Sequence, residues 1–371
     1  MTSTVGLATS GMDLSGIRRA VDGCLDDFLI HTATTAADHQ MPSEATQILR
    51  TFLFAGGKRL RPTLCAIGWH TAHGTAEADG GMSLGPTPVP VIQAATSLEM
   101  FHAFCLIHDD LMDHSATRRG RPTVHRALTS HHIGRGREIA EQLGASGAIL
   151  VGDLALAWSD ELLHTAGLTA GQLMTVLPLI DAMRTEVMYG QYLDLLATGI
   201  PSDDLGIPLQ VIRHKTAKYT VERPLQIGAA LAGAGRALLD VLSAYALPLG
   251  EAFQLRDDLL GVFGSPEVTG KSGLDDLRDG KHTVLLALGL QRADALQRQA
   301  LRTLVGDPAL DEDGADRIRS ILTATGAVQG VEDMITNRRT QAHQALDRAP
   351  FPPAATAVLR QLAHTATART S

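Results

Sequence analysis

Long runs rich in alanine and leucine dominate the chain and limit what it can fold into. Their apolar residues recur at helical spacing and lack the period-two alternation of half-buried strands. Aromatic residues make up only 4% of the sequence, which also disfavours a β-rich fold. We therefore expect an all-α protein, with helical runs over 91–114, 147–166, 170–198, 210–233, 236–263 and 281–305.

Segments rich in glycine, proline and polar residues separate these runs, and none of them has the character of a single interdomain linker. They predict loops over 74–90, 115–122, 198–208 and 264–280. The last of these carries four glycines, and loops of that length often have a function. Because the loops are spread evenly over 371 residues, we predict a flexible arm over 1–15 and one large all-α domain over 16–371.

The overall charge and the cysteine content exclude several classes of protein. A net charge of −8 disfavours a general nucleic-acid binder, although it permits an anionic ligand in a local basic pocket. Three widely spaced cysteines, Cys24, Cys65 and Cys105, predict neither a disulfide framework nor a zinc ribbon. No signal peptide and no uncharged apolar run of 18 residues is visible, so we expect no membrane span and a cytoplasmic location.

An acidic motif closes the first long apolar run. Asp109 and Asp113 are four residues apart, so both carboxylates lie on one helix face, and His102 lies two turns earlier on that face. Like charges at this spacing mildly destabilise a helix. Mg²⁺ would remove the penalty, because it prefers carboxylate oxygen and often bridges to substrate phosphates. The alternative is a solvated acidic helix end.

A second acidic pair, Asp257 and Asp258, closes another long apolar run just before the glycine-rich loop. Gln254 lies one turn before Asp257. One acidic helix end is common, but two in one all-helical chain are less so. If they face each other across a cavity, they would hold several Mg²⁺ ions, and those ions would bind a polyphosphate.

Basic residues cluster beside the acidic motifs. Gly57 precedes Lys58 and Arg61, which we expect within one helical turn. Arginine makes planar, multidentate contacts with phosphate, and lysine supplies a point charge. The spacing of a Walker phosphate loop is absent, and a charged helix start is the alternative. Further cations follow the acidic motif, occur near helix ends or lie in the glycine-rich loop: Arg118, Arg119, Lys215, Lys271 and Lys281.

Taken together, these motifs resemble the trans-isoprenyl diphosphate synthases, or polyprenyl synthetases, over roughly residues 45–300. The resemblance implies a bundle of helices around a deep central cavity, and usually a homodimer. It implies a prenyltransferase that condenses isopentenyl diphosphate with an allylic diphosphate (dimethylallyl, geranyl or farnesyl). The expected product is a short-chain, all-trans prenyl diphosphate, with the geranylgeranyl and farnesyl diphosphate synthases as the most similar members.

The resemblance also assigns roles to residues at matching positions. It implies Mg²⁺ ions, three per site, on Asp109, Asp113 and Asp257. The allylic diphosphate would be bound by Arg118, Lys215, Lys271 and Lys281, and isopentenyl diphosphate by Gly57, Lys58, Arg61, His102 and Arg119. Lys215, Thr216 and Gln254 would be the catalytic residues, with Thr216 and Gln254 steadying the carbocation. The second-tier cavity residues would be Asp110, Gln191, Asp194 and Asp258.

Two positions bear on product length and on metal binding. Phe104 and Cys105 precede Asp109 by five and four residues, where bulky groups floor the cavity in this family. A single aromatic there resembles the enzymes that make geranylgeranyl diphosphate, with plain core packing of Phe104 as the alternative. Gly261 stands where the usual second motif has its last aspartate. We expect activity to survive, with Asp257 making the direct metal contact.

Other functions stay open at this point. A terpene cyclase on the same fold would use the same acidic motifs but would not need Lys58, Arg61, His102 and Arg119 together, so these residues favour the transferase. A farnesyl or a longer-chain polyprenyl diphosphate synthase would differ only in product length. A regulatory subunit would typically lose its acidic motifs, and here the first is intact.

The remaining histidines carry weaker predictions. His108 and His114 flank the first acidic motif, and we expect them behind the metal ligands or in solvent, because Mg²⁺ prefers oxygen. His131 and His132 are expected to be solvated in a polar loop.

Overall fold

The computed structural model describes residues 12–73, 85–264 and 273–367. The prediction for Lys271 and most of the predicted N-terminal arm lie outside these residues. Within them the protein is almost entirely helical, so the predicted all-α class is confirmed. The first helix begins at Leu14, two residues inside the predicted arm.

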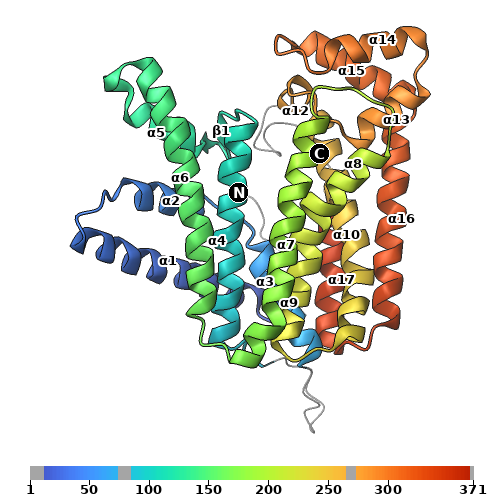
Figure 1. The fold of residues 1–371 in the computed structure, drawn as a ribbon. Coiled ribbons are helices and arrows are strands. Elements are labelled where there is room, and N and C mark those ends of the chain that lie inside the picture. Colours follow the sequence, from blue (N-terminus) through green and yellow to red (C-terminus); the bar gives the residue numbers. More distant parts are fainter. Residues whose placement is uncertain (1–11, 74–84, 265–272, 368–371) are drawn as a thin grey trace, which may run out of the picture.

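The helices of the first half form the left and central parts of the bundle in Figure 1. They are α1 (Leu14–Asp38), α2 (Glu44–Leu53), α3 (Leu60–Ala72), α4 (Val89–Met112), α5 (Val124–His131), the 3₁₀ turn η1 (Ile133–Arg135), α6 (Arg137–His164) and α7 (Ala170–Ala197). The predicted loop 115–122 holds two short antiparallel strands, β1 (Thr117–Arg118) and β2 (Arg121–Pro122).

The second half completes the bundle and covers one end of it (Figure 1). Its elements are α8 (Gly206–Val211), the π-helix η2 (Ile212–Glu222), α9 (Arg223–Leu231), α10 (Arg236–Phe263), α12 (Asp275–Arg278), α13 (Val284–Arg292), α14 (Ala295–Leu304), α15 (Glu312–Ala324), α16 (Ala327–Arg348) and α17 (Pro353–Thr367). The predicted run 281–305 is therefore two helices, and the predicted loop 264–280 contains the short α12.

Two groups of buried apolar side chains hold the bundle together. The larger surrounds α4 and includes side chains from α1, α3, α6, α7 and α9. The smaller joins α10 to α13, α15 and α16. Helices α3 and α9 approach closely because each presents a glycine to the other: a Cβ on Gly68 would overlap the backbone of Leu225, and one on Gly228 would overlap that of Cys65.

The predicted helix 210–233 is divided by the π-helix η2, in which hydrogen bonds reach from residue i to i+5. This stretch packs against two glycines on neighbouring helices. A Cβ on Gly190 of α7 would stand 2.5 Å from the backbone nitrogen of Lys215, and one on Gly250 of α10 would stand 2.5 Å from the Cα of Ala217. Glycine at both places gives the wider helix the room it needs.

Two helices, α4 and α6, are long and apolar enough to cross a membrane by length and composition alone. In α4, 67% of the apolar stretch is buried inside the protein, as in the core helix of a globular bundle. In α6 the buried share is 33%, so much of its apolar surface faces outward.

Candidate active site

One cavity of about 830 Å³ brings together most of the residues that the sequence singles out. It lies between α3, α4, α7, η2 and α10. A second cavity of about 550 Å³ shares the cations at its mouth and extends towards α12. The predicted residues that line one or both are Gly57, Lys58, Arg61, His102, Phe104, Cys105, Asp109, Arg118, Arg119, Gln191, Asp194, Lys215, Thr216, Gln254, Asp257, Asp258 and Lys281.

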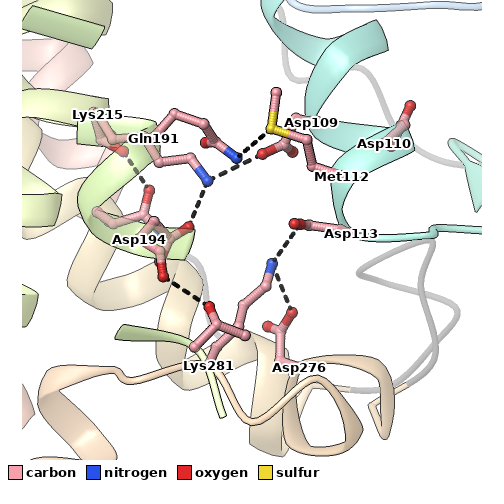
Figure 2. Close-up of polar contacts among 12 residues, drawn as sticks. Asp109, Asp110, Met112, Asp113, Gln191, Asp194, Lys215, Asp276 and Lys281 are labelled. Carbon is pink, nitrogen blue, oxygen red and sulfur yellow. Dashed lines mark hydrogen bonds and ion pairs between the residues drawn. The ribbon is translucent and has the colours of Figure 1, made fainter. Parts of the chain in front are cut away.

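The carboxylate of Asp109, one turn from the end of α4, is surrounded by cations. Lys215 Nζ lies 3.0 Å from its Oδ1 and Arg118 3.3 Å from its Oδ2. The same lysine lies 2.7 Å from Asp194 on α7 (Figure 2). Burial alone would raise the pKa of Asp109, but the charges of Lys215, Lys281 and Arg118 outweigh it and lower that pKa to about 2.

Asp113, the residue that ends α4, faces the segment that follows α10. Lys281 Nζ lies 3.3 Å from its Oδ2 and 3.4 Å from Asp276 Oδ1, so one lysine joins the two carboxylates (Figure 2). Burial, together with the charge of Asp109, raises the pKa of Asp113. The pKa of Lys281 lies well above its usual range, because the surrounding carboxylates outweigh the effect of burial.

Asp110 lies apart from the cavity. It is 1% exposed, it accepts hydrogen bonds of 2.8 Å from Arg118 Nε, and Figure 2 shows it pointing away from Asp109 and Asp113. Asp110 and Asp113 are not among the residues that line the two cavities. Asp110 therefore holds the guanidinium of Arg118 at the cavity edge, and its predicted place in the cavity is not what the structure shows.

The second acidic end forms a hydrogen-bonded chain with η2. The Thr216 hydroxyl donates to Gln254 Oε1 at 2.7 Å, and Gln254 Nε2 donates to Asp258 Oδ1 at 2.8 Å. Burial raises the pKa of Asp258 to about 8, and the charges of Asp257 and Asp276 add to this. Asp257, at the exposed edge of α10, lines the cavity directly.

Asp276 is a site residue that the sequence analysis missed. A Cβ on Gly261, where the second motif lacks its last aspartate, would overlap the Asp276 carboxylate. Asp276 and Gly261 also line the same cavity as Asp257 and Asp258. The space left by the missing side chain is thus filled by a carboxylate from α12. A signal was present, since Asp276 lies in the long glycine-rich loop five residues before Lys281.

The basic cluster is built on a turn, and the prediction that Lys58 and Arg61 share a helical turn is wrong. Lys58 precedes α3, and Arg59 adopts a left-handed φ of 49° just before the helix begins. Arg59 is 5% exposed and pairs with Glu99 at 2.9 Å and Asp22 at 2.7 Å, which hold this strained conformation. Gly57 has a φ of 142° and passes beside the guanidinium of Arg119.

Arg61 and His102 both contact side chains of η2 that the sequence analysis did not select. Arg61 stacks 4.2 Å above the ring of Tyr219 and donates to the hydroxyl of Thr220 at 2.7 Å. His102 Nδ1 lies 3.0 Å from the Tyr219 hydroxyl. Burial, with Arg61 and other nearby arginines, holds the pKa of His102 well below its usual range, so the ring is neutral. Tyr219 thus orients two residues predicted to bind isopentenyl diphosphate.

The floor of the cavity is apolar. Phe104 is 8% exposed and its ring lies 5.4 Å from that of Phe101 and 4.7 Å from that of His108. Cys105 lies beside it, and burial raises the pKa of this thiol to about 12, so it is protonated and unreactive. His108 also lines this cavity, with its Nε2 3.2 Å from the Ile149 carbonyl oxygen. Gln191 completes the wall near Met112.

The donor set fits a hard divalent cation. Asp109 and Asp257 line one cavity from different helices, with Asp113 and Asp276 joined through Lys281 nearby. Oxygen-only carboxylate ligands beside bound phosphate are the environment that Mg²⁺ prefers. In the metal-free protein, Lys215 and Lys281 partly neutralise these carboxylates.

Comparison with known proteins agrees with this geometry. Residues 42–322 match the model of the family described as polyprenyl synthetase. The chain is 32% identical to the geranylfarnesyl diphosphate synthase of Aeropyrum pernix, over 80% of this chain and 85% of that protein. It is 31% identical to the (2E,6E)-farnesyl diphosphate synthase of Mycobacterium bovis, over 83% of this chain and 78% of the other.

The fold is shared as well. A geranylgeranyl pyrophosphate synthase from Corynebacterium glutamicum, solved with isoprenyl diphosphate and magnesium, superposes with a TM-score of 0.89 and 40% identity. The match covers 97% of this chain and all of that one. With its two acidic helix ends facing one basic cavity, the chain belongs to the polyprenyl synthetase family.

Proposed function

We propose that this prenyltransferase uses Mg²⁺ to join isopentenyl diphosphate to an allylic diphosphate, and that its main product is geranylgeranyl diphosphate. The observation that carries the proposal is that one cavity has two different cationic regions. Lys215 and Lys281 lie among the carboxylates, whereas Lys58, Arg61 and Arg119 lie across the cavity near α3. Two cationic regions suit a reaction between two diphosphate substrates.

On the acidic side, the residues would bind the allylic diphosphate and hold its leaving group. Lys215, Lys281 and Arg118 provide fixed positive charge where negative charge develops as the bond to C1 breaks, which is usually the largest catalytic contribution. Three Mg²⁺ ions per site, held by Asp109, Asp113 and Asp257, would further neutralise that leaving group.

On the basic side, Lys58, Arg61, Arg119 and the neutral His102 would bind isopentenyl diphosphate, with Gly57 allowing close approach of the backbone. Between the two regions, the Thr216 hydroxyl and the Gln254 amide are held by their mutual hydrogen bond. Their oxygen atoms can face an allylic cation without reacting with it, while the apolar floor keeps water away. We assign no protein base, and the proton from C2 would leave with the departing diphosphate.

The basic side also distinguishes this proposal from a terpene cyclase, which ionises one diphosphate and does not need a second diphosphate site. The test is product analysis of the purified enzyme with Mg²⁺, isopentenyl diphosphate and each allylic diphosphate in turn. Linear prenyl alcohols after dephosphorylation, with the 20-carbon product dominant, support the proposal. Cyclic hydrocarbons formed without isopentenyl diphosphate would replace it with the cyclase, and a dominant 15-carbon or longer product would correct the chain length.

Product length is proposed to be limited by Phe104, because this ring lies at the cavity floor five residues before Asp109. Phe104→Ala removes the ring, so the chain should extend by at least one five-carbon unit. Phe104→Leu keeps an apolar side chain of similar depth and serves as the control. Mass spectrometry of the dephosphorylated products measures both variants, and an unchanged product in Phe104→Ala contradicts the assignment.

We also propose a homodimer that operates in the cytoplasm. Helices α6 and α7 adjoin through Arg184, which donates to Ser159 at 3.2 Å. Both helices carry exposed apolar side chains: Ile139, Ile149, Leu150, Met174, Met188, Tyr189, Tyr192, Leu195 and Leu196. A second copy would bury this surface. Sedimentation of the wild type and of Leu150→Glu should show a dimer that the substitution weakens, and a wild-type monomer contradicts the proposal.

A further inference from the structure

Two histidines and a glutamate meet outside the substrate cavity. His131 ends α5, His132 follows it, and Glu44 lies in the first turn of α2. His131 Nε2 lies 3.5 Å from Glu44 Oε1, and His132 Nε2 lies 3.3 Å from the same oxygen. Among the residues that the structure describes, this is the one group of three histidine, cysteine or acidic side chains whose ligand atoms lie within 4.8 Å of one another. The prediction that both histidines are solvated in a polar loop holds for the exposure of His131 alone, because His131 ends α5 and His132 is partly buried.

The two nitrogen–oxygen spacings in this group match tetrahedral coordination, and the ligand atoms all lie within 4.8 Å of one another. Two ligand atoms held at about 2.1 Å from a tetrahedral Zn²⁺ lie about 3.4 Å apart. Neighbouring ligands of an octahedral Mg²⁺ at about 2.1 Å lie only about 3.0 Å apart. The observed nitrogen–oxygen distances of 3.3 and 3.5 Å agree with the tetrahedral value. Imidazole nitrogen also favours zinc and its neighbours in the first transition series over magnesium.

One buried oxygen atom within the group supports a bound ion. In the described part of the protein, Glu44 Oε1 is buried and accepts no hydrogen bond, although both histidine rings lie beside it. A buried carboxylate oxygen without a hydrogen bond is costly, and a cation would compensate it. The side chain of His131 is 66% exposed and that of His132 is 21% exposed, so solvent can reach a fourth position. Three protein ligands plus water is a common coordination of zinc.

We infer that Glu44, His131 and His132 form a binding site for one zinc-like divalent transition-metal ion. The ion would join α2 to α5, two helices that line a small cavity together with the strand segment, through Phe52, Arg118, Arg119 and Val124 among others. Arg119 also donates to the Gly56 carbonyl just beyond α2. Binding would therefore hold the segment that presents Arg118 and Arg119 to the substrate cavity.

The test is a calorimetric titration of the full, tag-free chain with Zn²⁺, in excess Mg²⁺ so that the aspartates of the cavity are occupied. We expect one equivalent of Zn²⁺ to bind. Glu44→Gln, His131→Ala and His132→Ala should each weaken binding at least tenfold, and His164→Ala, an exposed histidine at the end of α6, should not. Co²⁺ provides a second readout, because tetrahedral coordination gives intense visible absorption and octahedral coordination gives weak absorption.

Each outcome of the titration either supports or overturns the proposed zinc site. Loss of binding and of the intense Co²⁺ spectrum in the Glu44 and histidine variants establishes the site. Binding that is lost only in Asp109→Ala would assign the metal to the substrate cavity and overturn the inference. Absence of Zn²⁺ binding in the wild type, or binding that the three substitutions leave unchanged, would overturn it as well. Because Glu44→Gln keeps the size of the side chain, this variant separates loss of a ligand from loss of structure.

Discussion

The ends of α4 and α10 carry the same pair of acidic residues but differ in their surroundings. At the end of α4, Asp109 contacts Lys215 and Arg118, and its pKa falls to about 2. At the end of α10, Asp258 accepts a hydrogen bond from the amide of Gln254, and burial raises its pKa to about 8. Asp109 is thus ionised and paired with cations of the protein, whereas Asp258 keeps a proton near neutral pH when no metal is bound.

The difference between these two pKa values shows that two acidic motifs of the same composition can form different kinds of site. The identity of the side chain is the same at both ends, and the neighbours set its charge. The end of α4 has fixed cations that also suit a diphosphate, so it combines metal ligands with anion-binding groups. The end of α10 gathers Asp257, Asp258 and Asp276 around one space, which suits the binding of a cation.

The largest expected effect comes from removing the ionised carboxylate at the end of α4. Asp109→Ala should lower kcat by about 10²–10³-fold, because a fixed part of the electrostatic stabilisation is lost. Lys215 and Arg118 keep their charges, so metal-free binding of inorganic diphosphate should become tighter than in the wild type. Steady-state kinetics and calorimetry in EDTA measure the two effects.

A surface aspartate serves as the control for this variant. Asp240 pairs with Arg236 on the exposed face of α10, so Asp240→Ala should change neither measurement. If Asp109→Ala weakens metal-free diphosphate binding, the end of α4 is not an anion-binding region and the contrast between the two ends fails.

A smaller effect is expected from restoring the missing aspartate at the end of α10. Gly261→Asp completes the usual motif, yet its Cβ would overlap the Asp276 carboxylate and bring a further negative charge. We expect activity to fall about tenfold and stability to fall by about 1–3 kcal/mol, as for other overpacked positions. Initial rates over a range of Mg²⁺ concentrations and thermal unfolding measure the change.

Two further variants separate the causes. Gly261→Ala adds the overlap without the charge, so a larger loss in Gly261→Asp isolates the electrostatic part. Gly261→Asp combined with Asp276→Ser removes the clash and should recover most of the lost activity. A fully active Gly261→Asp enzyme would show that Asp276 does not fill the place of the missing side chain.

The smallest effect concerns the protonated carboxyl at the end of α10. The ordinary pKa of aspartate is about 3.9, so a folded-state pKa of about 8 means that the folded protein holds an extra proton between these values. The contribution of Asp258 to stability is therefore complete at low pH and is lost as the pH rises towards 8. Asp258→Asn stays neutral, so in EDTA it should lose about 1 kcal/mol less than the wild type between pH 6 and pH 7.

A difference of this size corresponds to about 2 °C in Tm, which differential scanning calorimetry resolves. Asp240→Asn is the matched control and should follow the wild type at both pH values. Parallel pH dependence of the wild type and Asp258→Asn would show that Asp258 is ionised, and the two helix ends would then be electrostatically alike.

The sequence predicts the long helices better than the connections between them. The runs 170–198 and 236–263 match α7 and α10 closely, because uninterrupted helical periodicity directly reflects burial of one face. The run 210–233 also has helical spacing, but the π-helix within it depends on room beside Gly190 and Gly250, which are distant in sequence. No local pattern reports such a contact.

The site residues also divide into those that local sequence predicts and those that depend on contacts distant in sequence. Asp109, Asp257 and Lys215 could be selected from motifs, because their spacing and residue type reflect local chemistry. Tyr219 could not, since its importance arises only when it meets Arg61. Asp276 was indicated only by its place in the glycine-rich loop, and its contact with Gly261 appears only in the fold. Lys58 was placed wrongly because the left-handed turn at Arg59 depends on its pairing with Glu99, 40 residues away.

The π-helix η2 has a consequence for how this chain can vary. Four residues that face the cavity, Lys215, Thr216, Tyr219 and Thr220, lie within it. Loss of one residue would allow an ordinary α-helix, but each residue of an α-helix turns the chain by about 100°, so side chains on one side of the deletion would leave the cavity. A substitution in this segment alters one contact, whereas a change in its length alters every contact at once. Natural variants of this enzyme should therefore conserve the number of residues between Ile212 and Glu222, and should vary in identity mainly at positions that do not face the cavity.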